Sequence, residues 1–335
     1  MNSIKQRLWG IFVVVLFICY NHDLWSQHTA STDWKISYST TEAVARHENS
    51  FVPLGDNFYL IGGRGVKPVA IYDTRTNSWR TGKEPPMEIH HFQGATYNGK
   101  IYVIGAMTGK YPYETPVPNI LIYDPKEDDW EMDVEIPKER RRGSCGVVVD
   151  GDSAFLISGI VDGHNSTHVP WTDRFDFKTQ KWTVLADAPR ARDHFHAAIG
   201  NGKIYAAGGR NSSYATKQTF ELTVAPIDLY DVETDTWSTL DKKYNLPTER
   251  AGCSAVCYNN HLVVLGGESV AQELAHNEVE ALNLETMQWK AWKPLNTGRH
   301  GTQAILHNGH IYIAVGSGKR GGRPELNSIE KIKLN

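Results

Sequence analysis

The chain has 335 residues, of which 40% are hydrophobic and 22% are charged, a composition that supports a packed core and argues against disorder. Its formal net charge is −3 at pH 7, so it lacks the dominant basic field that broad binding to nucleic acid or to an anionic membrane requires. Any site for an anion must therefore be local.

The first 26 residues have the pattern of a secretory signal peptide. A basic start precedes a short apolar run, 11–19, and Ser26–Gln27 is a suitable cleavage point. We therefore expect a secreted or periplasmic protein. The bulky Ile18 before Cys19 makes a lipoprotein the less favoured alternative. No later segment is apolar for long enough to cross a bilayer, so no membrane span is expected.

From Trp34 onward the sequence repeats with a period of about fifty residues. The recurring tryptophans are Trp34, Trp79, Trp130, Trp182, Trp237 and Trp289. Earlier in each unit a β-branched run ends in a pair of small residues: Gly62-Gly63, Gly105-Ala106, Ser158-Gly159, Gly208-Gly209, Gly266-Gly267 and Val315-Gly316. Aromatic–acid pairs precede four of the tryptophans: Tyr72-Asp73, Tyr123-Asp124, Phe175-Asp176 and Tyr230-Asp231. Each unit therefore predicts four short strands separated by turns.

This pattern resembles the Kelch repeat, because the small pair, the aromatic residue and the tryptophan recur in register over nearly all of the chain after the signal peptide. The departures are small. Ala106 and Val315 replace glycines, and Leu282-Asn283 replaces the aromatic–acid pair of the fifth unit. The resemblance implies a β-propeller with one blade for each unit.

The two ends of the chain predict how the ring closes. The last unit stops after 329–334 without its tryptophan strand, and residues 33–36 have the pattern of that missing strand. In Kelch propellers the first and last strands complete one blade, which removes exposed sheet edges. We therefore expect an all-β, six-bladed propeller formed by a single domain, 27–335, after a signal peptide, 1–26.

The lengths of the loops predict which face carries the function. The turns between the first and second strands of each unit are tight, whereas the loops between the second and third strands are long. These long loops are 107–119, 160–173, 210–226, 268–277 and 317–327. Functional residues concentrate in long loops on a rigid scaffold, so we expect the site in the bowl that these loops surround.

Arginines occupy one position of the repeat, sixteen residues before the small pair, in every unit except the second, where Ile89 stands. They are Arg46, Arg142, Arg192, Arg250 and Arg299. Arg64 and Arg210, just after glycine pairs, are expected to point into the same bowl. A bowl ringed by guanidinium groups favours a carboxylate or a sulfate. The alternative is a structural role, in which each arginine pairs with carboxylates or carbonyls of its own blade.

Histidines follow these arginines in the repeat. His47, His90 and His300 stand one position later, and His91 and His194 stand two positions later. Three interpretations remain open: hydrogen-bonded structural residues, a divalent metal site formed by the first three, or general acid–base catalysis. The long loops bring further candidates to the bowl, namely His164, His168 and Tyr214.

Elimination on an acidic carbohydrate is the first function that these residues suggest. Removing the C5 proton of a uronic acid with loss of the group on C4 requires a cation beside the carboxylate, a base and an acid. Secreted propellers such as the ulvan lyases, and dehydratases of terminal uronates, are similar in fold and in this chemistry. We therefore expect a carbon–oxygen lyase or dehydratase whose partner is a uronate-containing oligo- or polysaccharide, sulfated or not.

The catalytic roles are assigned to His90, His194, His168 and Tyr214. The expected substrate-binding residues are Arg46, His47, Arg64, His91, Arg142, Arg192, Arg210, Arg250, Arg299 and His300. The main alternative is a propeller that binds a glycan or a protein without chemistry, and a second is an epimerase similar to the sialic-acid mutarotases. In each case we expect a monomer that binds no nucleic acid and requires no cofactor.

Overall fold

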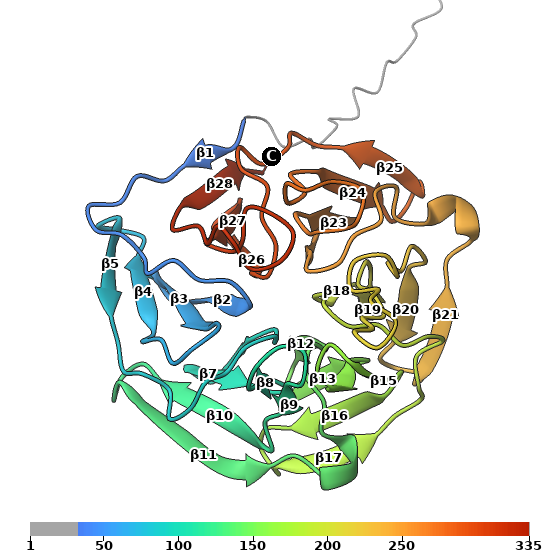
Figure 1. The fold of residues 1–335 in the computed structure, drawn as a ribbon, viewed down its shortest axis with the longest axis horizontal. Coiled ribbons are helices and arrows are strands. Elements are labelled where there is room, and N and C mark those ends of the chain that lie inside the picture. Colours follow the sequence, from blue (N-terminus) through green and yellow to red (C-terminus); the bar gives the residue numbers. More distant parts are fainter. Residues whose placement is uncertain (1–32, 335) are drawn as a thin grey trace, which may run out of the picture.

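The computed structural model describes residues 33–334 and arranges them as a ring of six four-stranded antiparallel sheets (Figure 1). The first strand of each sheet lines the central channel, and the fourth strand lies at the rim. This confirms the predicted six-bladed, all-β propeller. The predicted signal peptide, 1–26, and Cys19 lie outside the described residues. Within 33–334, no helix is long and apolar enough to span a bilayer.

Each blade is a meander of four strands that succeed one another from the channel outward. Blade 1 consists of β2 (Asn49–Leu54), β3 (Asn57–Gly62), β4 (Ala70–Asp73) and β5 (Ser78–Thr81). Blade 2 consists of β6 (Ala95–Tyr97), β7 (Lys100–Val103), β10 (Asn119–Asp124) and β11 (Asp129–Glu135). Blade 3 consists of β12 (Gly146–Asp150), β13 (Ser153–Ile157), β16 (Thr172–Asp176) and β17 (Lys181–Val184).

The second half of the ring follows the same order. Blade 4 consists of β18 (Ala198–Gly200), β19 (Lys203–Ala206), β20 (Asp228–Asp231) and β21 (Thr236–Thr239). Blade 5 consists of β22 (Ser254–Tyr258), β23 (His261–Leu265), β24 (Val279–Asn283) and β25 (Gln288–Ala291). Blade 6 consists of β26 (Ala304–His307), β27 (His310–Ala314), β28 (Ile329–Lys333) and β1 (Lys35–Ile36). Two 3-10 turns lie between blades, η1 (Lys138–Arg140) and η2 (Lys242–Tyr244).

The closing strand β1 comes from the other end of the chain, as predicted. It pairs with β28 in antiparallel register, with Lys35 opposite Lys331. The neighbouring Trp34 is buried in the hydrophobic cluster between blades 5 and 6, and its indole N–H donates to the carbonyl of Lys293 at 2.8 Å. Blade 6 therefore joins the two ends of the described chain and leaves no gap in the ring.

Hydrophobic side chains fill the spaces between neighbouring blades, with one cluster in each of the six spaces of the described ring. The repeated aromatic residues hold the outer half of each blade. Tyr72 packs on Trp79 with ring centroids 5.0 Å apart, and its hydroxyl donates to Asn77 Oδ1 at 2.8 Å. Asp73 closes the turn by accepting the backbone N–H of Arg75. The aromatic–acid pair and the tryptophan of the repeat therefore hold the third and fourth strands of the blade together.

The small-residue pairs lie where neighbouring blades come closest. Gly266 has a φ of +66°, and a Cβ on this residue would lie 2.4 Å from the carbonyl oxygen of Arg299 in the next blade. The backbone N–H of Gly267 donates to that same carbonyl at 2.8 Å. A side chain at Gly266 would therefore break the contact between blades 5 and 6.

Polar side chains link the first strands across the channel. The Oε1 atom of Gln93, which precedes β6, accepts the backbone N–H of Val147 at 2.8 Å and of Ala197 at 2.9 Å. Its Nε2 donates to the carbonyl of Ala197 at 2.9 Å. One buried amide therefore connects blades 2, 3 and 4 at the axis of the propeller.

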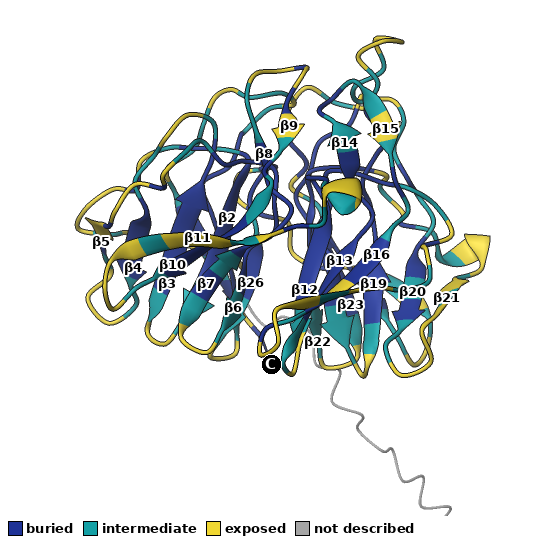
Figure 2. Cartoon of the chain, turned by 90° about the horizontal axis from the view of Figure 1, so that it is seen from below, coloured by how far each residue is buried: buried dark blue, intermediate teal, exposed yellow. Residues whose placement is uncertain are grey.

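The two faces of the ring differ in the length of their loops (Figure 2). Tight turns such as the one between β2 and β3 gather on one face, and the loops between second and third strands rise from the other. Two of these loops form hairpins of their own: β8 (Met107–Thr108) with β9 (Thr115–Pro116), and β14 (Ile160–Asp162) with β15 (Ser166–His168). The predicted long-loop face is present in the structure.

Candidate functional site

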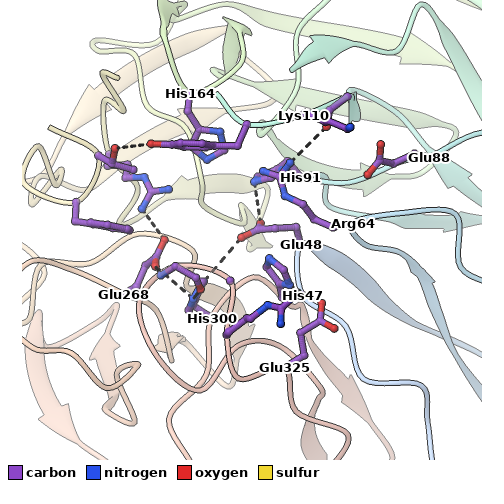
Figure 3. Close-up of a pocket in the computed structure, with 18 of the residues that line it drawn as sticks. His47, Glu48, Arg64, Glu88, His91, Lys110, His164, Glu268, His300 and Glu325 are labelled. Atoms are coloured by element: carbon purple, nitrogen blue, oxygen red, sulfur yellow. Dashed lines mark hydrogen bonds and ion pairs between the residues drawn. The ribbon is translucent and has the colours of Figure 1, made fainter. Parts of the chain in front are cut away.

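A pocket of about 860 Å³ opens on the long-loop face, at the mouth of the central channel (Figure 3). Every blade contributes to its wall, through the long loops and through the segments that lead into the first strands. The volume lies within the range of roughly 300–1,000 Å³ that ligand pockets occupy. The charged and aromatic side chains of this wall are His47, Glu48, Arg64, Lys67, Glu88, His91, Lys110, Tyr111, His164, Arg210, Phe220, Glu268, His300, Arg323 and Glu325.

Register-equivalent residues from all six blades form the floor beneath this pocket and line a smaller cavity below it. They are Glu48, His91, Ser144, His194, Gly252 and Gly301, and each has a φ between +51° and +63°. Their backbones bond to one another: the N–H of His91 donates to Glu48 at 3.0 Å, and the N–H of Ser144 donates to His91 at 2.8 Å. The left-handed conformation is costly for residues other than glycine, so the surrounding structure must impose it.

Glu48 is the carboxylate of this floor (Figure 3). Its Oε2 atom lies 3.3 Å from His91 Nε2, and its Oε1 atom lies 3.9 Å from His300 Nδ1. Burial raises the pKa of Glu48, but the nearby basic side chains outweigh burial and lower this pKa to about 2. Glu48 is therefore a buried anion beside these imidazoles.

A second network joins blades 4, 5 and 6 at the side of the pocket. Arg210 Nη1 lies 2.6 Å from Glu268 Oε1, and both side chains are buried. His300 Nε2 lies 3.3 Å from Glu268 and within 2.8 Å of the carbonyls of Lys319 and Gly321. Burial raises the pKa of Glu268, but the charges of His300 and Arg210 lower it below its ordinary range. The network fixes a carboxylate in the wall of the pocket.

His47, which leads into blade 1, and Glu325, in the long loop of blade 6, form a hydrogen-bonded pair. The two are joined at 2.7 Å through His47 Nδ1, and Lys67 Nζ lies 3.3 Å from the same carboxylate. The His47 side chain is 12% exposed and lines the pocket. A histidine oriented by a carboxylate through one nitrogen is the arrangement that a general base requires.

The rim of the pocket carries cations and aromatic rings. Lys110 and Arg323 are exposed and form no ion pair within residues 33–334. Tyr111 stands beside Tyr214, with ring centroids 5.8 Å apart. Phe220 completes the aromatic part of the wall. The predicted residue Tyr214 is 43% exposed and lies at this rim, not within the pocket.

The five register-matched arginines do not ring the bowl as expected. Arg46, Arg142, Arg192, Arg250 and Arg299 are at most 1% exposed, and none lines the pocket. Each guanidinium turns back into its own blade and donates to the carbonyl sixteen residues later; Arg250 Nε, for example, donates to Gly266 at 2.7 Å. Four of them also pair with a buried carboxylate of the third strand: Asp173, Asp228, Glu280 and Glu330. Their placement therefore agrees with the alternative prediction, in which each arginine pairs with carboxylates or carbonyls of its own blade.

The histidines assigned to catalysis lie beneath the pocket. His90 is fully buried, and its Nε2 bonds to the carbonyl of Gly109 at 3.1 Å. Burial, followed by the charge of Arg64, lowers the pKa of His90 to about 4. His168 Nε2 lies 2.9 Å from Asp193 Oδ2, and His194 Nδ1 lies 2.9 Å from the other oxygen of the same carboxylate. None of these three histidines lines the pocket, whereas the predicted residues His47, His91, Arg64, Arg210 and His300 do.

The interpretation of His47, His90 and His300 as a metal site does not fit the described chain, because each binds a different partner: Glu325, Gly109 and the carbonyls of 319 and 321. The structure instead brings together His91, His164 and His194. One nitrogen from each ring lies within 4.8 Å of the other two, and all three side chains are buried. His164 comes from the hairpin of β14 and β15, within the long loop 160–173 that was predicted to bring it to the bowl.

Several residues of the pocket were missed from the sequence. Glu48 occupies the same position of the repeat as His91 and His194, so this register was the signal that could have found it. Glu268 follows a glycine pair just as Arg64 and Arg210 do. Acidic residues in the long loops, such as Glu325, carried no comparable signal.

Comparisons with known proteins agree with this architecture. Residues 131–318 match the family model described as the KLHDC2/KLHL20/DRC7 Kelch-repeats domain. Over 287 residues the chain is 24% identical to the Kelch-like protein terF of Aspergillus terreus, a match that covers 81% of this chain and 61% of that protein. Over 279 residues it is 25% identical to Kelch-like protein 23 of Homo sapiens, which covers 82% of this chain and 46% of that protein. The chain therefore spans less than two thirds of these relatives.

A solved structure described as the structure of YjhT has the same fold. It superposes with a TM-score of 0.73 at 15% sequence identity, covering 87% of this chain and 95% of that one. At this level of identity the likeness concerns the fold alone.

Proposed function

This chain belongs to the Kelch-repeat family of β-propellers, and we propose that its pocket binds a short acidic saccharide. The observation that carries the proposal is the pair of exposed cations at the rim, Lys110 and Arg323, which have no acidic partner in the described chain. Other basic side chains of the pocket already have an acidic partner: Lys67 pairs with Glu325, and Arg210 pairs with Glu268. A ligand carboxylate or sulfate would supply the partner that the rim cations lack.

The rest of the wall suits the neutral part of a sugar. Glu268 and Glu325 are fixed by cationic partners, so their free lone pairs can accept hydrogen bonds from hydroxyl groups. Tyr111 and Phe220 offer aromatic surface in the wall of the same pocket. Such a combination of apolar surface with a few fixed polar groups is typical of small-ligand pockets.

Calorimetric titration with a galacturonate trisaccharide and with the neutral galactose trisaccharide tests this proposal. We expect the acidic sugar to bind more tightly, and the double variant K110A/R323A to lose about tenfold or more of that affinity. The matched control is K181A/K290A, which removes two exposed lysines from the outer strands β17 and β25 and should leave binding unchanged. Equal affinity for the two sugars, or no loss in K110A/R323A, would contradict the proposal.

The pair formed by His47 and Glu325 favours a second candidate, elimination on the bound uronate. In this reaction His47 takes the proton from the carbon beside the carboxylate, the electron pair forms the double bond, and the bond to the leaving oxygen breaks. That oxygen receives a proton from Tyr111 or from water. A cation at the rim neutralises the charge that develops on the carboxylate. The base is thus reassigned from the buried His90 and His194 to the accessible His47.

Formation of the unsaturated product, followed by its ultraviolet absorbance, distinguishes this candidate from binding alone. We expect His47→Ala to abolish turnover while binding persists, and His310→Ala, a change on the short-turn face, to have no effect. Binding of the acidic trisaccharide without any product from the unaltered protein would end the elimination candidate and leave the binding proposal standing.

A further inference from the structure

Three imidazoles meet beneath the pocket, each carried by a different blade. His91 leads into blade 2, His164 lies in the hairpin above blade 3, and His194 leads into blade 4. Their ring centroids are 4.7–5.0 Å apart, and their side chains are at most 7% exposed. Packing three basic rings together out of water is costly unless something compensates for the loss of hydration.

The hydrogen bonds of the rings show which nitrogen is free in each. His164 Nδ1 lies 3.0 Å from Glu114, and His194 Nδ1 lies 2.9 Å from Asp193. A carboxylate accepts, so both Nδ1 atoms carry the proton, and in the neutral form of each ring Nε2 then presents a lone pair. His194 Nε2 is buried without any hydrogen-bond partner. A buried polar atom of this kind requires an explanation, and an ion is one.

The partners of His91 lead to the same tautomer. His90 Nε2 donates to the carbonyl of Gly109, so His90 Nδ1 accepts, and His91 Nδ1 must donate to it across 2.6 Å. This leaves the lone pair of His91 Nε2 only 3.3 Å from the carboxylate of Glu48. Two electron-rich atoms at this distance repel each other unless a cation lies beside them.

We propose that His91, His164 and His194 bind a divalent transition-metal ion of the zinc class, with an open coordination position toward the pocket. Three imidazoles favour zinc, cobalt, nickel or copper over magnesium and calcium, which prefer oxygen ligands. Three protein ligands with one open position is the pattern of catalytic zinc sites. His91 and His164 line the pocket, so the open position faces a ligand that enters there.

The surroundings of the three histidines support the proposal. Metal-binding histidines commonly donate their other ring nitrogen to a carboxylate, as His164 does to Glu114 and His194 does to Asp193. These carboxylates are themselves fixed, Glu114 by Arg64 and Asp193 by His168. With zinc–nitrogen bonds of about 2.1 Å, tetrahedral ligand atoms lie about 3.4 Å apart, so the rings must rotate slightly inward when the ion binds.

The test uses metal ions alone and is therefore independent of the saccharide. Protein purified without a histidine tag and freed of metal with a chelator is titrated calorimetrically with Zn²⁺, and with Co²⁺ to record the absorption of a tetrahedral site. We expect one ion per chain. H164A and H194A should each weaken binding more than a hundredfold, and E114Q should weaken it about 10- to 100-fold.

The matched control is His276→Asn, because His276 is also buried on the long-loop face and bonded to a glutamate, Glu278, but lies outside the cluster. It should bind Zn²⁺ as the unaltered chain does. Circular dichroism and size exclusion confirm that each variant is folded, and E114Q, which keeps all three imidazoles, provides an independent reading if H164A or H194A fails to fold. No binding by the unaltered protein, or equal weakening in the control variant and in H164A, would overturn the proposal.

Discussion

Arg299→Met separates the structural role of the register-matched arginines from a role in ligand binding. Arg299 donates to the carbonyls of Val315 and Ser328, each at 3.1 Å, and pairs with Glu330. Both charged side chains are 0% exposed. Methionine retains much of the volume, but it removes every one of these donors and leaves the carboxylate of Glu330 buried without its cation.

Removing one partner of a buried ion pair costs about 3–5 kcal/mol. Two backbone N–H groups, of Asn296 and Thr297, still donate to Glu330 in the variant, so we expect a value near the lower end, about 3 kcal/mol. The measurement is the free energy of unfolding from urea denaturation at neutral pH, compared between the unaltered chain and R299M. Arg80→Met, on the exposed outer strand β5, is the matched control and should change the free energy by about 0.5 kcal/mol or less.

The same variants are then titrated with the acidic trisaccharide under conditions in which they remain folded. We expect R299M to bind as the unaltered protein does, because its side chain does not reach the pocket. A variant that unfolds like the unaltered chain but loses its ligand would refute the reasoning, since it would place the guanidinium of Arg299 at the ligand.

Two further predictions concern the wall and the axis of the propeller. Burial raises the pKa of Glu325, but the hydrogen bond from His47 and the charge of Lys67 lower it below its ordinary value, so Glu325 contributes stability at neutral pH that is lost as the pH falls through its folded-state pKa. The free energy of unfolding should therefore decrease less steeply toward acid pH in E325Q than in the unaltered chain. Identical dependence of this free energy on pH in the two proteins would contradict the prediction. Gln93→Leu strands the two backbone N–H groups that its oxygen accepts and should lower the free energy of unfolding by about 2–4 kcal/mol, measured by urea denaturation; an unchanged value would mean that water replaces the amide.

The fold could be predicted from the repeat because several of the repeated side chains bond to the backbone of their own turns. In the fifth unit, Asn283 replaces the usual aspartate, yet its Oδ1 accepts the N–H groups of Glu285 and Thr286 just as Asp73 accepts those of its own turn. The substitution retains the acceptor oxygen and therefore the turn. Trp34 identified the closing strand for a similar reason, since it fills the space between blades that a fourth-strand tryptophan is suited to fill.

The candidate site was harder to predict, because the position of a residue in the repeat predicts where its Cα lies but not the direction of its side chain. The arginines do begin near the channel, but their side chains turn back into their blades, where Asp173, Glu280 and Glu330 receive three of them. Those acids stand about thirty residues after each arginine on the third strand, a sequence signal for ion pairs within the blade.

The histidine cluster depended on two further features that pattern alone does not provide. His91 and His194 have φ values of +54° and +51°, a conformation that a sequence motif without glycine does not predict. His164 lies in a hairpin whose length is particular to blade 3. The contact between these residues is therefore a property of the assembled ring.

The closing blade also determines where a linker or a label can be attached without blocking the pocket. The third strand of this blade, β28, ends at the short-turn face, where the backbone N–H of Leu334 donates to the carbonyl of Gly309 in the tight turn between β26 and β27. Leu334 therefore lies on the side opposite to the long loops that surround the pocket (Figure 2). A linker, a fluorophore or a sensor surface joined at this position would leave the mouth of the channel unobstructed.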